Sequence, residues 1–229
     1  MQGANSRRLI ELSHEIEAGM TTYPGLPGPV IADHLSRDGS RGHYAEGTTF
    51  QIGRIEMIAN TGTYLDSPFH RFAEGRDLAA LPLERFADLD GVAINAVPVL
   101  AATTEGRALG PELFAGLDLR GKAVLVHTGW DRRWRTPQYG EGHPFLTRAS
   151  VEELIAAGAA LVGIDSMNID DTRDGERPAH TLLLGAGIPI VEHLCGLGEL
   201  PPSGFRFHSA PAPFRGVGSF PVRAYAIVE

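Results

Sequence analysis

Residues 60–70, NTGTYLDSPFH, bring together a carboxamide, a phenol, a carboxylate and an imidazole, namely Asn60, Tyr64, Asp66 and His70. These four residues share one parity, so an extended backbone would direct their side chains to one face. Convergence on one centre also requires a bend, which Gly62 permits because glycine adopts left-handed backbone angles. Pro68 prevents a continuing helix. We therefore expect a curled loop between strands that directs polar groups at one point.

The residue types in this loop predict proton transfer. An imidazole with an ordinary pKa takes up and releases protons near neutral pH, and a carboxylate orients an imidazole or binds a metal. His70 and Asp66 are accordingly candidate catalytic residues. The alternative is a local hydrogen bond between them in a turn, because Gly-Thr and Ser-Pro are common turn sequences.

A second stretch, residues 178–192 with the sequence PAHTLLLGAGIPIVE, contains His180 and Glu192. We expect His180 at the start of a helix and Glu192 at the end of a strand, so their spacing alone does not predict a contact. Together with NTGTYLDSPFH, this stretch resembles the family of metal-dependent cyclases and bacterial kynurenine formamidases. The resemblance extends to MTTYPG near the start of the chain and to PVRAYAIVE at its end.

The resemblance implies that Asp66, His180 and Glu192 bind a metal and that His70 acts as acid and base. The family has two further metal-binding histidines where this chain has Asn60 and Tyr64. A neutral amide is a poor zinc ligand, and a phenol must lose a proton with a pKa near 10 to bind well. We therefore expect either one divalent metal, zinc or manganese, or a metal-free site, in place of the pair of zinc ions common in the family.

Asn60 and Tyr64 both offer hydrogen-bond donors, which stabilise a developing oxyanion. Tyr64 is thus a candidate catalytic residue, and both residues are candidates for substrate binding. Trp130 precedes an irregular segment rich in aromatic residues, over residues 131–147, and is a third candidate for substrate binding. The alternative for Asn60 and Tyr64 is a site that binds a ligand without turning it over.

Length and composition indicate an ordinary globular protein. The 229 residues, 43% hydrophobic and 21% charged, suit a single cyclase-like domain over residues 1–229. A formal charge of −8 argues against nucleic-acid and anionic-membrane partners. The sequence contains no apolar run of signal-peptide or membrane-spanning length. The single cysteine, Cys195, excludes an internal disulfide and is typical of a reducing cytoplasm.

Apolar patterns predict an α/β domain with a mixed, β-rich core and short peripheral helices. Strands are expected over residues 9–16, 51–59, 91–100, 122–130, 161–165, 188–192, 205–210 and 222–228. Helices are expected over residues 81–89, 151–159 and the stretch after His180. The polar residues 33–48 are expected to form an exposed loop, with a lid over the site as one interpretation. The family resemblance implies a swivelling β/β/α architecture and a homodimer.

These features predict a small cytoplasmic hydrolase or cyclase that acts on a compact amide, lactone or related carbonyl compound. Water is the expected nucleophile, activated by His70 with or without a metal. Formamide cleavage is the best-known activity of the family and is not expected here, because the ligand set is incomplete. The alternative is a catalytically silent protein that binds a small metabolite on the same fold.

Overall fold

The computed structural model describes residues 7–102 and 106–229. Its main element is a nine-stranded sheet, formed by β1 (Arg8–Glu11), β4 (Tyr64–Asp66), β5 (Leu89–Asn95), β7 (Ala123–His127), β9 (Leu161–Ile164), β10 (Ile190–Glu192), β11 (Ser203–His208), β12 (Ser219–Pro221) and β13 (Tyr225–Val228). The strand order is β1-β13-β11-β5-β7-β9-β10-β4-β12. The first and last strands of the chain therefore pair with each other, while β4 lies near the opposite edge.

The centre of the sheet is parallel and its flanks are antiparallel. Strands β5, β7, β9 and β10 run parallel to one another. Strand β4 pairs antiparallel with both β10 and β12, and β11 pairs antiparallel with β5 and β13. Few and short helices accompany this curled sheet, which confirms the expected mixed α/β class with a β-rich core.

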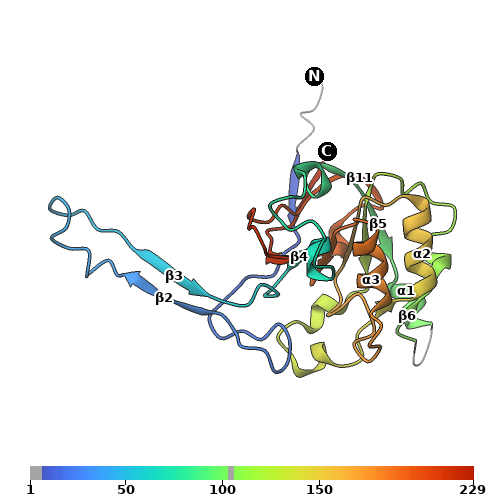
Figure 1. Ribbon diagram of the computed structural model, residues 1–229, viewed down its shortest axis with the longest axis horizontal. Coiled ribbons are helices and arrows are strands. Elements are labelled where there is room, and N and C mark those ends of the chain that lie inside the picture. Colours follow the sequence, from blue (N-terminus) through green and yellow to red (C-terminus); the bar gives the residue numbers. More distant parts are fainter. Residues whose placement is uncertain (1–6, 103–105) are drawn as a thin grey trace, which may run out of the picture.

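Alternating side chains of the central strands pack into two separate hydrophobic cores. Val124 and Val126 belong to a core with the two longest helices, α2 (Arg148–Ala157) and α3 (Pro178–Gly185). Ala123 and Leu125 point to the other face, where they pack with residues of β1, β11 and β13. In Figure 1, α2 and α3 lie next to each other beside the sheet. Both faces of β7 are therefore buried, which explains its continuous apolar sequence.

Several short elements connect the strands. They are α1 (Val97–Ala101), β6 (Ala108–Leu109), β8 (Phe145–Leu146) and the 3-10 helices η1 (Pro68–His70), η2 (Leu83–Arg85), η3 (Pro111–Leu113), η4 (Trp130–Arg133), η5 (Pro137–Gly140) and η6 (Leu197–Glu199). Strand β6 pairs with β8 outside the main sheet. Over the described residues, no helix is both long and apolar enough to cross a membrane.

Several expected elements differ from the structure, and the strand expected over residues 9–16 already ends at Glu11. The strand expected over residues 91–100 ends at Asn95, because Pro98 suits the first turn of α1 and cannot donate a ladder hydrogen bond. The helix expected over residues 81–89 is only the 3-10 turn η2. Helix α2 begins at Arg148, ahead of the expected start, because the Thr147 side chain caps the backbone N–H of Ser150.

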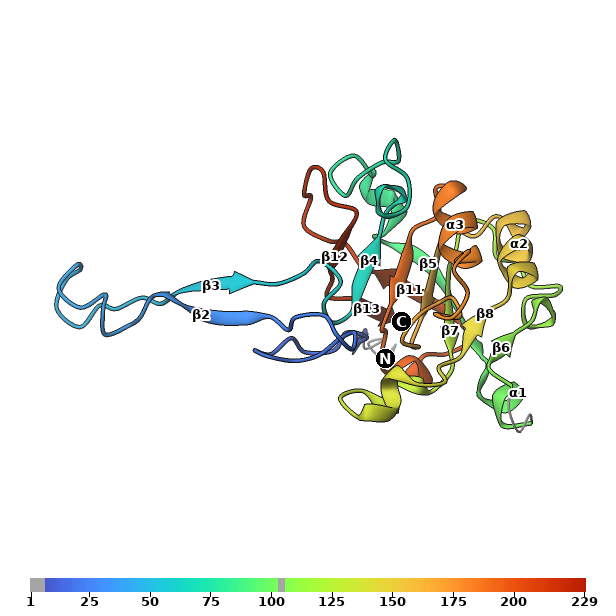
Figure 2. The ribbon, with the colours of Figure 1, turned by 60° about the horizontal axis from the view of Figure 1, so that its bottom comes forward.

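The segment before β4 forms a long hairpin arm from β2 (Val30–Leu35) and β3 (Ile52–Glu56). The arm projects away from the body of the molecule in both Figure 1 and Figure 2. Residues 33–48, expected to be a loop with a possible role as a lid, continue β2 and turn at the far end of the arm. The interpretation as a lid over the chain's own site is therefore wrong, because pairing of β2 with β3 carries this segment outward.

Candidate active site

The register of three neighbouring strands places the polar residues of β4 together. Tyr64 lies opposite Glu192 of β10, and Asp66 lies opposite Ser219 of β12. Tyr64 and Asp66 are two residues apart on one strand, so all four side chains share one face of the sheet. Gly62 has a φ of 65°, which provides the expected bend before the strand. The expected curled loop is thus in part a sheet strand, but its polar side chains do gather on one face.

Glu192 is buried and its two carboxylate oxygens accept hydrogen bonds from the protein. Tyr64 donates to Oε2 at 2.5 Å, and the backbone N–H of Ile169 donates to Oε1 at 2.7 Å. The Tyr23 hydroxyl lies 3.1 Å from Oε2 and 2.7 Å from the Tyr64 hydroxyl. Burial raises the pKa of Glu192 and raises that of each phenol well above its usual value. The two phenols therefore stay neutral and act as donors to this carboxylate.

His180 is the third residue of α3, and Asp170 determines its orientation. The Asp170 carboxylate accepts the backbone N–H groups of Ala179 and His180, and its Oδ2 lies 2.6 Å from Nδ1 of His180. Because Asp170 accepts this hydrogen bond, the Nδ1–H of His180 is its donor and Nε2 points away. Nε2 lies 3.6 Å from Oδ2 of Asp66 and 3.7 Å from Oε1 of Glu192.

The electrostatic environment of His180 strongly favours a positive charge. Burial of the imidazole lowers its pKa, but Glu192, Asp170 and Asp66 outweigh that effect and raise the pKa of His180 to about 10. Without a bound cation, the imidazole is therefore protonated at neutral pH. The site is built to hold one positive charge at Nε2, either a proton or a metal ion.

Ser219 joins Asp66 to His70. The Ser219 hydroxyl donates its single proton to Oδ1 of Asp66, and its oxygen lies 2.8 Å from Nδ1 of His70. Since that proton is already donated, the serine oxygen accepts the Nδ1–H of His70. In the neutral form of the imidazole, this hydrogen bond places the ring proton on Nδ1 and the lone pair on Nε2. The His70 side chain is 35% exposed, whereas those of Asp66 and His180 are 0% and 9% exposed.

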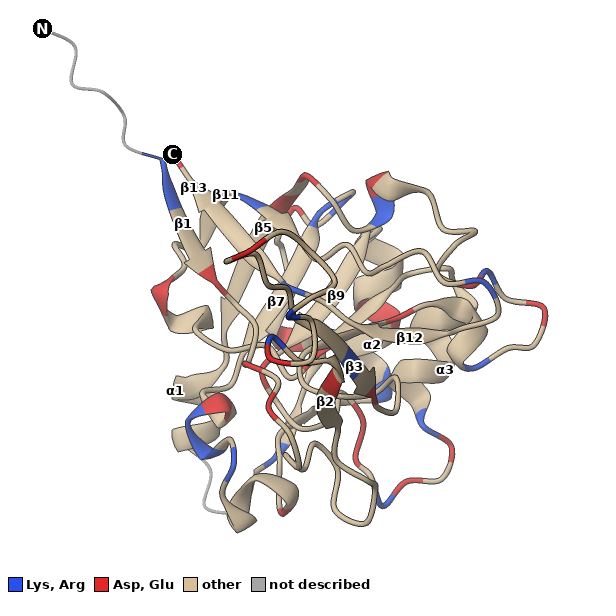
Figure 3. Ribbon diagram, turned by 90° about the vertical axis from the view of Figure 1, so that its left-hand side faces the viewer, with Lys and Arg blue, Asp and Glu red and all other residues tan. Residues whose placement is uncertain are grey.

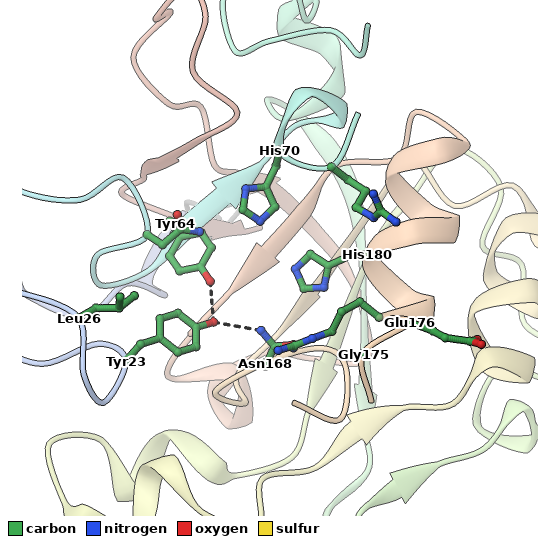
Figure 4. Close-up of a pocket in the computed structure, with 11 residues that line it drawn as sticks. Tyr23, Leu26, Tyr64, His70, Asn168, Gly175, Glu176 and His180 are labelled. Carbon is green, nitrogen blue, oxygen red and sulfur yellow. Dashed lines mark hydrogen bonds between the residues drawn. The ribbon is translucent and has the colours of Figure 1, made fainter. Parts of the chain in front are cut away.

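Tyr64, His70 and His180 border a cavity of about 370 Å³, drawn in Figure 4. Tyr23, Tyr64 and Asn168 line one side, and His70 and His180 face it from two different elements (Figure 4). Asn60 also lines the cavity. Trp130 is not among its lining residues, since its indole N–H donates to the carbonyl of Tyr139 and its ring packs under Arg133.

Asp66, His70 and His180 form a group that could hold a metal ion, with one ligand atom from each lying within 4.8 Å of the others. Oδ2 of Asp66 is buried and accepts no hydrogen bond among the described residues, and the cationic group facing it is Nε2 of His180, 3.6 Å away. A buried carboxylate oxygen without a donor is costly, and a cation is the natural partner for it. Glu192, the third ligand expected from the sequence, lies beside His180. Its carboxylate already accepts hydrogen bonds from the Tyr64 hydroxyl and the backbone N–H of Ile169.

Four residues of the site carried no functional role in the sequence reasoning. They are Tyr23, Asn168, Asp170 and Ser219. Tyr23 lies within MTTYPG, a stretch noted only for its family resemblance. Asn168 and Asp170 belong to an acidic loop that follows β9. Ser219 has no motif around it, and only the pairing of β12 with β4 brings it to Asp66.

Comparison with known proteins finds relatives that match nearly the whole chain. The chain is 28% identical over 218 residues to a kynurenine formamidase of Geobacillus thermodenitrificans, covering 94% of this chain and 95% of the relative. Isatin hydrolase A from Labrenzia aggregata superposes with a TM-score of 0.82 at 22% identity, over 97% of this chain and 94% of the other. A structure described as a potential metal-dependent hydrolase with cyclase activity superposes with a TM-score of 0.78 at 21% identity, over 98% and 99%.

The names of these relatives denote hydrolases, in agreement with the expected enzyme class. The sequence model of the Cyclase family matches residues 10–171, which is more than half of the chain. The expected resemblance is thereby confirmed, and the protein belongs to the cyclase family.

Proposed function

We propose that this protein hydrolyses a small amide, lactone or related cyclic carbonyl compound, with water as the nucleophile and His70 as the proton-transfer group. The observation that carries this proposal is the hydrogen-bonded series Asp66–Ser219–His70, which engages Nδ1 of His70 and leaves Nε2 of this accessible imidazole as the nitrogen available for proton transfer. The formamidase and isatin hydrolase among the relatives support the reaction class.

We further propose that Asp66 and His180 hold a single divalent metal, with Glu192 adjacent. Three features fit a cation: the buried Oδ2 of Asp66 has no donor, Nε2 of His180 faces two carboxylates, and Asp170 fixes the imidazole from behind. When bound, such a metal lowers the pKa of water and polarises a carbonyl oxygen. Tyr64 and Asn60 occupy positions that carry histidine ligands elsewhere in the family, so a second metal is not expected.

Proton transfer and binding of the substrate carbonyl are assigned to residues of the chain. His70 takes a proton from water at Nε2 and later returns it to the leaving nitrogen or oxygen, while Ser219 and Asp66 keep the ring in this tautomer. The carboxamide of Asn60 has no hydrogen-bond partner among the described residues, and it lines the cavity. We assign to Asn60 a hydrogen bond to the substrate carbonyl.

In this proposal Tyr64 does not contact the substrate directly. Its hydroxyl is 2.5 Å from Glu192 and 2.7 Å from Tyr23, so its donor is already engaged. We infer that Tyr64 acts as a positioning residue that holds Glu192 behind His180. Trp130, expected from the sequence to bind substrate, remains a prediction that the cavity lining does not support.

The decisive experiment compares wild type with His70→Asn on a panel of formanilides, lactones and cyclic imides. The variant should lose about a hundred- to ten-thousand-fold in rate on whichever substrate the wild type accepts. Metal affinity is measured on the same samples, because the geometry also suits His70 as a third ligand. Unchanged affinity supports the role of base, while lost affinity identifies His70 as a ligand. If the wild type turns over no member of the panel but binds some of them, the alternative of a binding protein is favoured.

We propose a homodimer in which the arms cover one another or the partner's body. The arm exposes several large apolar side chains, including Val30, Ile31, Phe50, Ile52 and Ile55, with Ile55 being 61% exposed. A two-stranded hairpin without further packing is only marginally stable in water. A second copy of the chain would bury this surface.

Light scattering after size exclusion tests the dimer. Ile31 and Ile55 are cross-strand partners, so Ile31→Lys with Ile55→Lys places charge on one patch of the arm. The double variant should be monomeric. Leu9→Lys is a matched control, since Leu9 is 68% exposed on the body of the molecule. A wild type that is itself monomeric contradicts the proposal.

The setting we propose is the cytoplasm, with a small molecule as substrate and no nucleic-acid or membrane partner. The net charge of −8 supports the absence of a nucleic-acid or anionic-membrane partner. Basic and acidic residues are interspersed in the view of Figure 3.

A further inference from the structure

Two arginines, Arg71 and Arg177, line the candidate cavity. Neither forms an ion pair with a carboxylate among the described residues. Arg71 donates through Nε to the Thr181 hydroxyl at 3.3 Å, and its guanidinium lies over the Phe72 ring. Arg177 donates to Oδ1 of Asn168 at 3.1 Å, with a longer contact of 3.5 Å to the carbonyl of Thr172. Every acceptor of these two cations is therefore neutral.

Arg177 lacks a carboxylate partner although its own loop is acidic. The neighbouring acids each interact elsewhere: Asp170 with His180, Asp171 with Arg173, Asp174 with the backbone N–H of Glu176, and the Glu176 side chain with Arg148. The arrangement thus satisfies these four carboxylates and leaves one half-buried guanidinium beside the cavity. Since the chain has a net charge of −8, an arginine without a carboxylate partner at this place requires an explanation.

The backbone at Arg177 supports a functional explanation. Arg177 has φ 48° and ψ 61°, the left-handed region, and directly precedes Pro178 at the start of α3. This conformation is unfavourable for a residue with a Cβ atom, and such residues are concentrated at ligand sites. Glycine would relieve the strain but would remove the guanidinium. An arginine therefore occupies a position whose left-handed backbone conformation favours glycine.

We propose that Arg177, assisted by Arg71, selects substrates that carry a carboxylate away from the bond to be hydrolysed. A guanidinium offers paired N–H donors that match the two oxygens of a carboxylate. Asp66 and Glu192 lie deeper in the same site and already face the positive charge at His180, so a substrate carboxylate away from the reacting bond needs its own positive counterpart at the cavity wall. This inference rests on the proposed function, because it assigns specificity to the same cavity.

The test measures binding to the purified protein, so that it does not depend on turnover. Calorimetry compares 2-aminobenzoate with 2-aminobenzamide, which differ in charge and little in shape. We expect the carboxylate to bind at least tenfold more tightly to wild type. Arg177→Gln should weaken the carboxylate roughly ten- to hundredfold and leave the carboxamide unchanged, as expected for one charge-assisted contact. Arg177→Lys should restore part of the preference.

Arg173→Gln is the matched control. Arg173 lies four residues away in the same loop, pairs with Asp171 and does not line the cavity, so its loss removes the same charge without touching the site. It should leave the preference intact. A purely structural role for Arg177, in holding Asn168, would weaken both ligands equally and would overturn the proposal. Equal affinity of wild type for the two ligands, absence of binding, or a preference that survives in Arg177→Gln would overturn it as well.

A second measurement separates this inference from the proposed reaction. The rates of 4-formamidobenzoate and 4-formamidobenzamide are compared in the same variants. If neither compound is hydrolysed while the charge preference in binding holds, the hydrolase assignment to this substrate class fails and the specificity assignment stands. If both are hydrolysed at equal rates and Arg177→Gln slows neither, the reaction stands and Arg177 is not a specificity-determining residue.

Discussion

Asp170→Asn is the substitution that most sharply tests the position of the proposed cation. Asp170 does not border the cavity, but its Oδ2 lies 2.6 Å from Nδ1 of His180. The substitution removes the negative charge behind the imidazole and retains an oxygen that can still accept the backbone N–H of Ala179. It therefore changes the electrostatics of His180 with little change in volume.

The expected magnitude follows from that one contact. A hydrogen bond to a charged group contributes about 1.5–3 kcal/mol, which corresponds to roughly a ten- to hundredfold change in an equilibrium constant. Loss of a carboxylate that orients a metal-binding histidine typically weakens metal affinity by about the same factor. We therefore expect zinc to bind to Asp170→Asn about ten- to hundredfold more weakly than to wild type.

Competition with a chromophoric chelator measures this affinity. The assay is run at two pH values, because a proton and a metal compete for Nε2 of His180, whose pKa is raised to about 10 by its carboxylates against the opposing effect of burial. Asp171→Asn is the matched control, since that neighbouring carboxylate pairs with Arg173 at the surface. Zinc affinity within twofold of wild type in a folded Asp170→Asn protein would refute a cation at His180.

Three further predictions test other parts of the site. Ser219→Ala should lower the rate about tenfold and alter its pH profile while metal affinity is kept, because one hydrogen bond that orients His70 is lost; unchanged kinetics would contradict this role. Asn60→His with Tyr64→His should raise the number of bound metals per chain in elemental analysis, and an unchanged number would count against the correspondence of these positions with family ligands. Unfolding free energy should decrease as the pH falls from 6.5 towards 4, because burial lowers the pKa of His14 to about 4; urea titrations of His14→Gln should show a weaker dependence in that window.

The sign of the last prediction follows from proton linkage. The unfolded chain binds a proton at His14 near pH 6.5, while the folded chain does so only near pH 4. Stabilisation from neutral His14, which stacks on Trp134 with ring centroids 4.1 Å apart, is therefore complete above pH 6.5 and is lost as the pH falls through the folded pKa. A steeper acid dependence in the variant would contradict this reasoning.

The sequence predicted which side chains share a face better than it predicted their partners on other strands. The shared parity of Tyr64 and Asp66 correctly placed them on one face, because a two-residue period is a local property of an extended chain. Their partners Glu192 and Ser219 come from β10 and β12, and pairing with these strands depends on the whole sheet. No local pattern specifies that register.

Errors in the predicted elements have similar causes. The arm was missed because residues 33–48 are polar and glycine-containing, and the strand character of Val30–Leu35 becomes evident only through its pairing with Ile52–Glu56. The substrate-binding role of Trp130 rests on residue type alone and stays a prediction, and its indole N–H is used within its own loop. Asp170 carried no functional role in the sequence reasoning, because its contact with His180 depends on the start of α3.

The measurement that most directly tests the central claim is metal content determined together with activity. Protein purified without chelator is dialysed and analysed by inductively coupled plasma mass spectrometry, and the same sample is assayed on the panel of amides, lactones and imides before and after chelation. The account predicts one divalent metal per chain, with activity that is lost on chelation and restored by one equivalent. Two tightly held metals per chain, or full activity in metal-free protein, would contradict it.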